Sequence, residues 1–169
     1  APGLRLGFLV APKAIYPKLL QAKQAVDLHT PSFTQRMVAE VLKGGFLSRH
    51  VPTIRALYKQ QRDAMLAALD REMAGLDVQW DGRDGGRLLW VRVAEGRGAV
   101  TLQPRAVERG VAFVPGAAFY AEQGDPRTLR LSFVTASVEQ INIGIKALAQ
   151  AVRAALPAAT ASPALEPVA

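Results

Sequence analysis

The sequence TLRLSF, residues 128–133, shows the clearest strand pattern in the chain. Its apolar and polar residues alternate with the two-residue period of a β-strand, and Arg130 lies at its centre. A guanidinium inside a core-like strand is costly to desolvate unless it is paired. One interpretation is that strand alternation simply places Arg130 on a solvent-exposed face. The other is that Arg130 binds an anion, for which the planar set of N–H donors of a guanidinium is well suited. Both interpretations are open on this pattern.

The residues before this strand predict further elements of a small α+β domain. Val78-Gln79-Trp80 and residues 87–93 flank the turn cluster DGRDGG, a pattern typical of a β-hairpin. We also expect a short helix at 103–109 and a strand at 111–114. These elements suffice for a small domain over residues 75–156.

A long helix is predicted to close this domain. Ser137 and Gln140 have the form of a capping box, with serine at the N-cap and glutamine three residues later. One face of the following helix is apolar, formed by Val138, Ile141, Ile145, Leu148, Val152 and Leu156. Residues 157–169 are rich in alanine and proline and have no periodicity, so we expect a disordered tail.

Residues 1–48 predict an incomplete structural unit. Pro2-Gly3 is a turn, and Leu4 to Val10 then reads as a buried strand that contains Arg5, open to the same two interpretations as Arg130. Two helices follow, the first over residues 15–27. One strand and two helices cannot bury their own apolar faces, so we expect the end of a larger α/β domain.

Glycines and a proline predict how this part is joined to the next. The second helix should stop at Gly44-Gly45, because glycine readily takes a left-handed C-terminal cap. From Pro52 to about Ala74 a polar-rich segment has a narrow apolar stripe. We expect a connecting helix, and assign residues 49–74 to it.

The composition excludes several classes of protein. The chain has 169 residues, 21 Lys+Arg and 14 Asp+Glu, and a net charge of +7, but the basic residues are scattered, which disfavours direct binding of nucleic acid. Without cysteine there is no disulfide, zinc-cysteine site or thiol nucleophile. No apolar run approaches the roughly 20 residues of a membrane span. We expect a soluble, cytoplasmic chain with no membrane partner.

Motifs of ordinary catalysis are absent from the sequence. It contains no HExxH, GxSxG or Walker motif, and we expect no metal site. His29 and His50 lie near helix ends, where capping or surface roles are the simpler interpretation. The sequence FVPGAAFY, residues 113–120, is either an ordinary strand exit or the wall of a binding pocket, since small residues beside aromatics allow close approach of a ligand.

Four segments together resemble a known family. They are PGLRLGFLVAP at 2–12, LLQAKQAVDLHTPSFTQ at 19–35, GVAFVPGAAFY at 110–120 and TLRLSF at 128–133. Their order and spacing resemble the fold-type I pyridoxal-phosphate aminotransferases of classes I and II. The similarity is greatest to 2-aminoadipate and kynurenine aminotransferases and to the aminotransferase-like domains of MocR-type GntR regulators.

The resemblance extends to about Leu156 and implies an α/β fold. The chain would be a C-terminal fragment, with the last strand and helices of the large cofactor-binding domain in residues 1–48. The α+β small domain would follow the connecting helix. A missing N-terminal large-domain segment would be its partner.

The resemblance also implies a cofactor and the roles of two arginines. The cofactor would be pyridoxal 5'-phosphate. Arg5 matches the arginine that contacts its phosphate, and Arg130 matches the arginine that binds the α-carboxylate of the substrate. The Schiff-base lysine would lie about three residues upstream of Ala1. The chain would therefore contain no catalytic residue, and the isolated fragment is predicted to be inactive.

The function implied for the full-length protein is transamination. An α-amino group would move from an amino acid to a 2-oxo acid such as 2-oxoglutarate, in a homodimer. Alternatives are a MocR-type regulator, in which an upstream winged-helix domain would bind nucleic acid, and a pyridoxal-phosphate lyase or decarboxylase. The sequence departs from the family at Arg87, where relatives have an apolar residue; Arg87 would favour an acidic substrate or face solvent.

Overall fold

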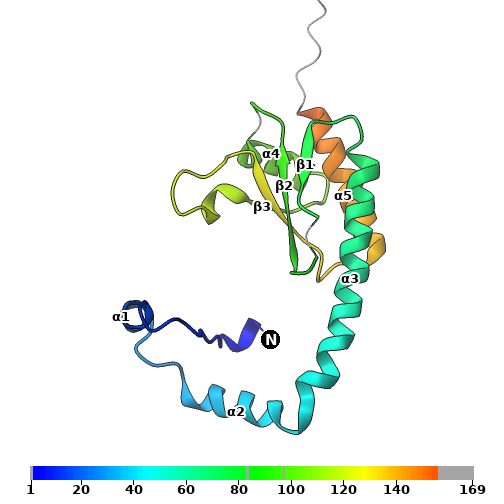
Figure 1. The fold of residues 1–169 in the computed structure, drawn as a ribbon. Coiled ribbons are helices and arrows are strands. Elements are labelled where there is room, and N and C mark those ends of the chain that lie inside the picture. The colour runs from blue at the N-terminus through cyan, green and yellow to red at the C-terminus, as the bar shows by residue number, and fades with distance from the viewer. Residues whose placement is uncertain (1, 83, 97, 156–169) are drawn as a thin grey trace, which may run out of the picture. The chain divides into compact units, whose positions relative to one another are not determined.

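A computed structural model describes residues 2–82, 84–96 and 98–155 of the chain (Figure 1). The tail predicted to be disordered, residues 157–169, lies outside the described residues. The chain divides into two compact units, Ala1–Thr53 and Ile54–Ala169, here called unit 1 and unit 2.

Unit 1 consists of helices and extended chain. Its elements are the 3-10 helix η1 (Pro2–Leu4), the helices α1 (Tyr16–Val26) and α2 (Ser32–Leu42), and the 3-10 turn η2 (Lys43–Gly45). Both predicted helices are confirmed. Gly44 and Gly45, with φ of 66° and 73°, lie in the left-handed region directly after α2, as the sequence predicted.

The strand predicted at Leu4–Val10 is not formed, and this prediction of a last strand of the large domain is wrong for this structure. A strand needs a neighbour for its backbone hydrogen bonds, and the described part of unit 1 contains no other strand. Phe8, Leu9 and Val10 are instead 94%, 69% and 88% exposed. The apolar pattern therefore identifies residues that need a partner, and the partner decides whether they form a strand.

The helix α3 (Phe46–Glu72) begins in unit 1 and continues into unit 2. The sequence predicted its start at Pro52, because proline favours a first turn, but the helix begins six residues earlier and Pro52 lies within it. Its buried residues are all in the second half, namely Gln61, Met65, Ala68 and Leu69. Only this half contributes to a core.

Unit 2 contains a four-stranded antiparallel sheet in the order β1-β2-β4-β3. The strands are β1 (Val78–Trp80), β2 (Leu88–Val93), β3 (Val114–Pro115) and β4 (Thr128–Ser132). The predicted hairpin of β1 and β2 is confirmed. The strand predicted at 111–114 was wrong in its bounds, because only two residues pair with β4.

Two helices complete unit 2, α4 (Ala99–Val107) and α5 (Val138–Ala154). The helix predicted at 103–109 begins at Ala99 instead, and the 3-10 helix η3 (Gly116–Phe119) follows β3. The capping box at the start of α5 is confirmed. The Gln140 amide donates to Ser137 Oγ at 3.1 Å, and the Ser137 amide donates to Gln140 Oε1 at 2.8 Å.

The hydrophobic core of the described residues lies entirely in unit 2. Leu89, Val91 and Val93 of β2 alternate with exposed or half-buried neighbours and pack with Leu129 and Leu131 of β4. Buried residues of α3, α4 and α5 join the same cluster. The other face of the sheet carries the alternate residues of β2 and β4, including Trp90, Arg92 and Arg130, and lies outside this core. Among the described residues, no helix is long and apolar enough to cross a membrane.

Candidate functional site

Arg130 lies on the face of the sheet opposite the core. In β4 the buried residues Leu129 and Leu131 flank it, so strand alternation directs its side chain to the other face. It is directly opposite Trp90 on one neighbouring strand and Val114 on the other. The alternation predicted from the sequence is confirmed, and Arg130 is half-buried rather than fully exposed.

The Arg130 guanidinium stacks on an aromatic ring. Its Cζ lies 4.1 Å from the centroid of the Phe119 ring, which is a cation–π distance. Within residues 2–82, 84–96 and 98–155, the Arg130 side chain has no hydrogen bond or ion pair. Its in-plane N–H groups are thus available to an anion.

Trp90 supports this ring from its own strand. The Trp90 and Phe119 rings meet edge to face, with centroids 5.9 Å apart and an interplanar angle of 84°. Tyr120 approaches the same indole at 6.2 Å and 72°. Edge-to-face contacts of this kind are favourable pairings of aromatic quadrupoles. Three aromatic rings therefore cluster beside the arginine.

Gly116 allows η3 to pack closely against the sheet. A Cβ at this position would collide with the Trp90 ring and with Thr128 Oγ1, and would lie 2.8 Å from Thr128 Cβ. Gly124 similarly faces the backbone of Ala117, with no room for a side chain. These contacts hold the segment that carries Phe119 against β2 and β4.

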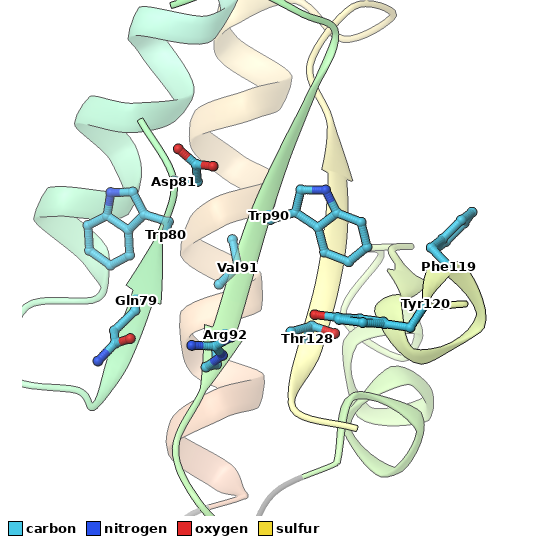
Figure 2. Close-up of a pocket in the computed structure, with 9 residues that line it drawn as sticks. All are labelled: Gln79, Trp80, Asp81, Trp90, Val91, Arg92, Phe119, Tyr120 and Thr128. Carbon is cyan, nitrogen blue, oxygen red and sulfur yellow. The ribbon is translucent and has the colours of Figure 1, made fainter. Parts of the chain in front are cut away.

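A pocket of about 440 Å³ adjoins the aromatic cluster (Figure 2). Phe119 and Tyr120 line it, so the segment 113–120 does form a pocket wall, one of the two interpretations of its sequence. In Figure 2 these two rings and Trp90 lie together, with Thr128 beside them. The remaining lining residues are Gln79, Trp80, Asp81, Val91 and Arg92.

Asp125 pairs with Arg92, one of the residues that line this pocket. Arg127 donates to both of its carboxylate oxygens, at 2.9 and 3.0 Å, and Arg92 Nε lies 3.0 Å from Oδ2. The side-chain hydrogen bond from Arg127, followed by that from its backbone amide, lowers the pKa of Asp125 from 3.8 to about 2. The same pairing raises the pKa of Arg127. Asp125 therefore remains ionised and holds the half-exposed Arg92 at the pocket.

A second group of basic residues lies along α3. Arg62, whose side chain is only 14% exposed, pairs with Asp63 at 2.8 Å and Asp84 at 3.0 Å. Hydrogen bonds from Lys59 and Arg62 lower the pKa of Asp63, and the bond to Asp63 raises the pKa of Arg62. These charges are largely matched within the protein. Arg87, before β2, is exposed.

Arg5 lies in unit 1, after η1. It is exposed and has φ of 53°, the single non-glycine residue of the described chain in the left-handed region. No carboxylate of the described residues pairs with it. Its charge is thus available to a phosphate. Arg5 and Arg130 belong to different units, so their predicted roles at one site remain predictions.

The two histidines were the remaining candidate residues from the sequence. His50 stacks on Phe46 of the same helix at 5.1 Å, and His29 is exposed. The described residues contain no group of three histidine, cysteine, aspartate or glutamate residues placed to hold a metal.

Sequence reasoning missed the surroundings of Arg130. It did not single out Trp90, Phe119 as a ring under the guanidinium, or the pairing of Asp125 with Arg92. The glycine beside aromatics in 113–120 was the available signal. The register of β2 and β4, which places Trp90 beside Arg130, cannot be read from this segment alone.

Comparison with known proteins agrees with the family expected from the sequence. The chain matches the family described as "Aminotransferase class I and II" over residues 1–148. It is 43% identical over 156 residues to the 2-aminoadipate transaminase of Thermus thermophilus, covering 92% of this chain and 39% of that protein.

Two solved structures have similar folds. The first is LysN, the α-aminoadipate aminotransferase of Thermus thermophilus complexed with N-(5'-phosphopyridoxyl)-L-leucine, at 43% identity and a TM-score of 0.78. The second is the kynurenine aminotransferase of Pyrococcus horikoshii in complex with PMP, at 40% identity and a TM-score of 0.80. The matches cover 90% and 93% of this chain, and 39% of either relative. The chain thus spans about two fifths of the length of these relatives.

Proposed function

Because the chain belongs to the aminotransferase class I and II family, we propose that it is part of a pyridoxal-phosphate-dependent aminotransferase. The reaction would move an α-amino group from an amino acid to a 2-oxo acid such as 2-oxoglutarate. The observation that carries this proposal is Arg130, a half-buried arginine without an ion pair in the described residues, held on an aromatic ring beside a pocket.

Arg130 would bind the α-carboxylate of the amino acid. A guanidinium presents paired N–H groups that match the two oxygens of a carboxylate. Fixing the carboxylate restricts the rotation of the substrate and so orients its α-carbon for reaction. An exposed lysine would give the same charge without this directional fit.

The phosphate of the cofactor would be held by Arg5. Arg5 suits a phosphate ligand chemically, since its guanidinium is exposed and unpaired within the described residues. When bound, pyridoxal phosphate supplies an electron sink for charge that develops at the α-carbon of an amino acid. The contribution of this chain would be to hold the phosphate through Arg5 and the substrate carboxylate through Arg130.

We also propose a source for the Schiff-base lysine, the inactivity of the fragment, and an oligomeric state and location for the full-length protein. The Schiff-base lysine would be supplied by sequence outside the chain, and the fragment by itself would be inactive. The full-length protein would be a cytoplasmic homodimer. A regulator that senses an amino acid is the alternative, and it would bind substrate without completing turnover.

The test is Arg130→Leu in the full-length protein that contains this chain. We expect the KM for L-glutamate to rise about 100-fold, because charge-assisted hydrogen bonds to the carboxylate are lost. Bound cofactor, measured by its absorbance, should stay near one per subunit as in the unsubstituted protein. Arg109→Leu is the control, because Arg109 pairs with its own neighbours at the end of α4, Arg105 and Glu108.

Two results would contradict the proposal. Equal loss of cofactor and substrate would mean that Arg130 does not act on the substrate carboxylate. Binding of L-glutamate without any transfer to a 2-oxo acid in the unsubstituted protein would favour the regulator.

A further inference from the structure

The contact between Arg130 and Phe119 uses only one surface of the guanidinium. With Cζ 4.1 Å from the ring centroid, the cation is attracted to the π-face of the ring. The N–H groups of a guanidinium lie in its plane, at the edges, and a carboxylate approaches along those edges. The Phe119 ring, packed on the face of the Arg130 guanidinium, therefore restricts the orientation of the guanidinium but leaves its N–H groups free to bind a ligand.

The Phe119 ring is itself held in place. Trp90 meets it edge to face at 5.9 Å, and Trp90 lies directly opposite Arg130 across β2 and β4. Gly116 brings the start of η3 into contact with the same indole. The arginine, the phenylalanine and the tryptophan thus form a closed set of contacts built on two paired strands and one short helix.

We propose that Phe119 is a positioning residue that orients the Arg130 guanidinium for a substrate carboxylate. The inference rests on the proposed function, in which Arg130 binds that carboxylate. Arginine has many rotamers, and the ordering of a free side chain weakens the binding of a ligand. A guanidinium already held on a ring has lost part of that freedom before the substrate arrives.

Phe119 is a practical residue to change. Its side chain is 48% exposed and does not belong to the buried core, so its truncation should leave the fold intact. Phe119→Leu removes the π-face, while Phe119→Tyr retains it. The matched control is Val100→Ala, which truncates an apolar side chain of comparable exposure, 63%, on α4, and Val100 neither lines the pocket nor contacts Arg130.

The experiment uses the full-length protein with two probes, L-glutamate and its α-carboxamide, isoglutamine. The carboxylate preference is the ratio of the two values of kcat/KM. We expect Phe119→Leu to lower this preference about three- to ten-fold, as loss of a cation–π contact permits, mainly through the KM for L-glutamate. Phe119→Tyr should retain the preference of the unsubstituted protein, and Val100→Ala should leave it unchanged. Cofactor content and the unfolding temperature confirm that each variant is folded.

A double variant separates this inference from the proposed function. If Phe119 acts through Arg130, Phe119→Leu should have little further effect on the preference in the Arg130→Leu background. If Arg130→Leu itself leaves the preference unchanged, the proposed function fails. If Arg130→Leu abolishes the preference but Phe119→Leu does not lower it, or lowers it equally without Arg130, the role of Phe119 is overturned.

Discussion

Units 1 and 2 are built from similarly apolar sequence but bury it very differently. In residues 3–53 no side chain is buried, and the aromatic side chain of Phe8 is 94% exposed. In unit 2, strands and helices share one cluster in which Leu69, Leu129 and Leu148 are completely inaccessible. The helices α1 and α2 have no buried residue at all.

An apolar pattern in the sequence therefore specifies which face of a helix or strand is apolar, and does not specify what packs on that face. In unit 2 the partner of each apolar face is within the unit, so the face becomes core. In unit 1 no other element of the unit covers the apolar faces of α1 and α2, and residues 4–10 do not form the predicted strand. Matched substitutions in the two units test this difference in burial.

The largest effect is expected from truncating the core. Leu129→Ala in β4 should destabilise the chain by about 3 kcal/mol, since burial is lost and a cavity remains. Leu9→Ala in unit 1, where the side chain is 69% exposed, should change stability by less than about 0.5 kcal/mol. Urea unfolding monitored by circular dichroism measures both. A similar loss in the two variants would show that unit 1 buries Leu9 in solution.

A glycine pair probes close packing in the same way. Gly116→Ala should cost about 1–3 kcal/mol, because the new Cβ collides with Trp90 and Thr128. Gly7→Ala should be nearly neutral, since nothing lies within 4 Å of the added Cβ. The unfolding temperatures of the two variants measure this difference in stability. A neutral Gly116→Ala would mean that η3 does not pack on the sheet.

Helix capping gives a smaller contrast. Ser137→Ala should cost about 1 kcal/mol, because it removes the acceptor for the Gln140 amide at the start of α5. Ser32→Ala at the first position of α2 serves as the control, since no side-chain cap is found at that helix start. Equilibrium unfolding should show little change for the control. Equal costs would remove the distinction between the two helix starts.

The smallest effect concerns pH. The pKa of Asp125 is about 2 in the folded protein and 3.8 as its ordinary value, so its ion pairs stabilise the fold fully above about pH 4. This contribution should be lost as the pH falls toward 2. Asp125→Asn should flatten that part of the stability profile, because the ionised carboxylate that pairs with Arg127 is gone. An unchanged profile in Asp125→Asn would contradict the pairing with Arg127.

Much of unit 2 could be predicted from its sequence. The hairpin, the alternation around Arg130 and the capping box depend on neighbouring residues, and all three are present. The predicted start of α3 was wrong because the helix continues through Pro52, and the predicted bounds of β3 were wrong because they depend on pairing with β4. The roles of Arg5 and Arg130 came from the resemblance and remain predictions.

The alternation of the strands, the glycine stop after α2 and the cap at Ser137 could be read from the sequence, because they arise from the conformational preferences of adjacent residues. The family could also be read from the sequence. The stacking of Arg130 on Phe119, eleven residues earlier, and the edge-to-face contact of Trp90 with that ring could not be read from the sequence. That arrangement requires the pairing of β2 with β4 and the close approach at Gly116, which are properties of the packed chain and not of any one segment.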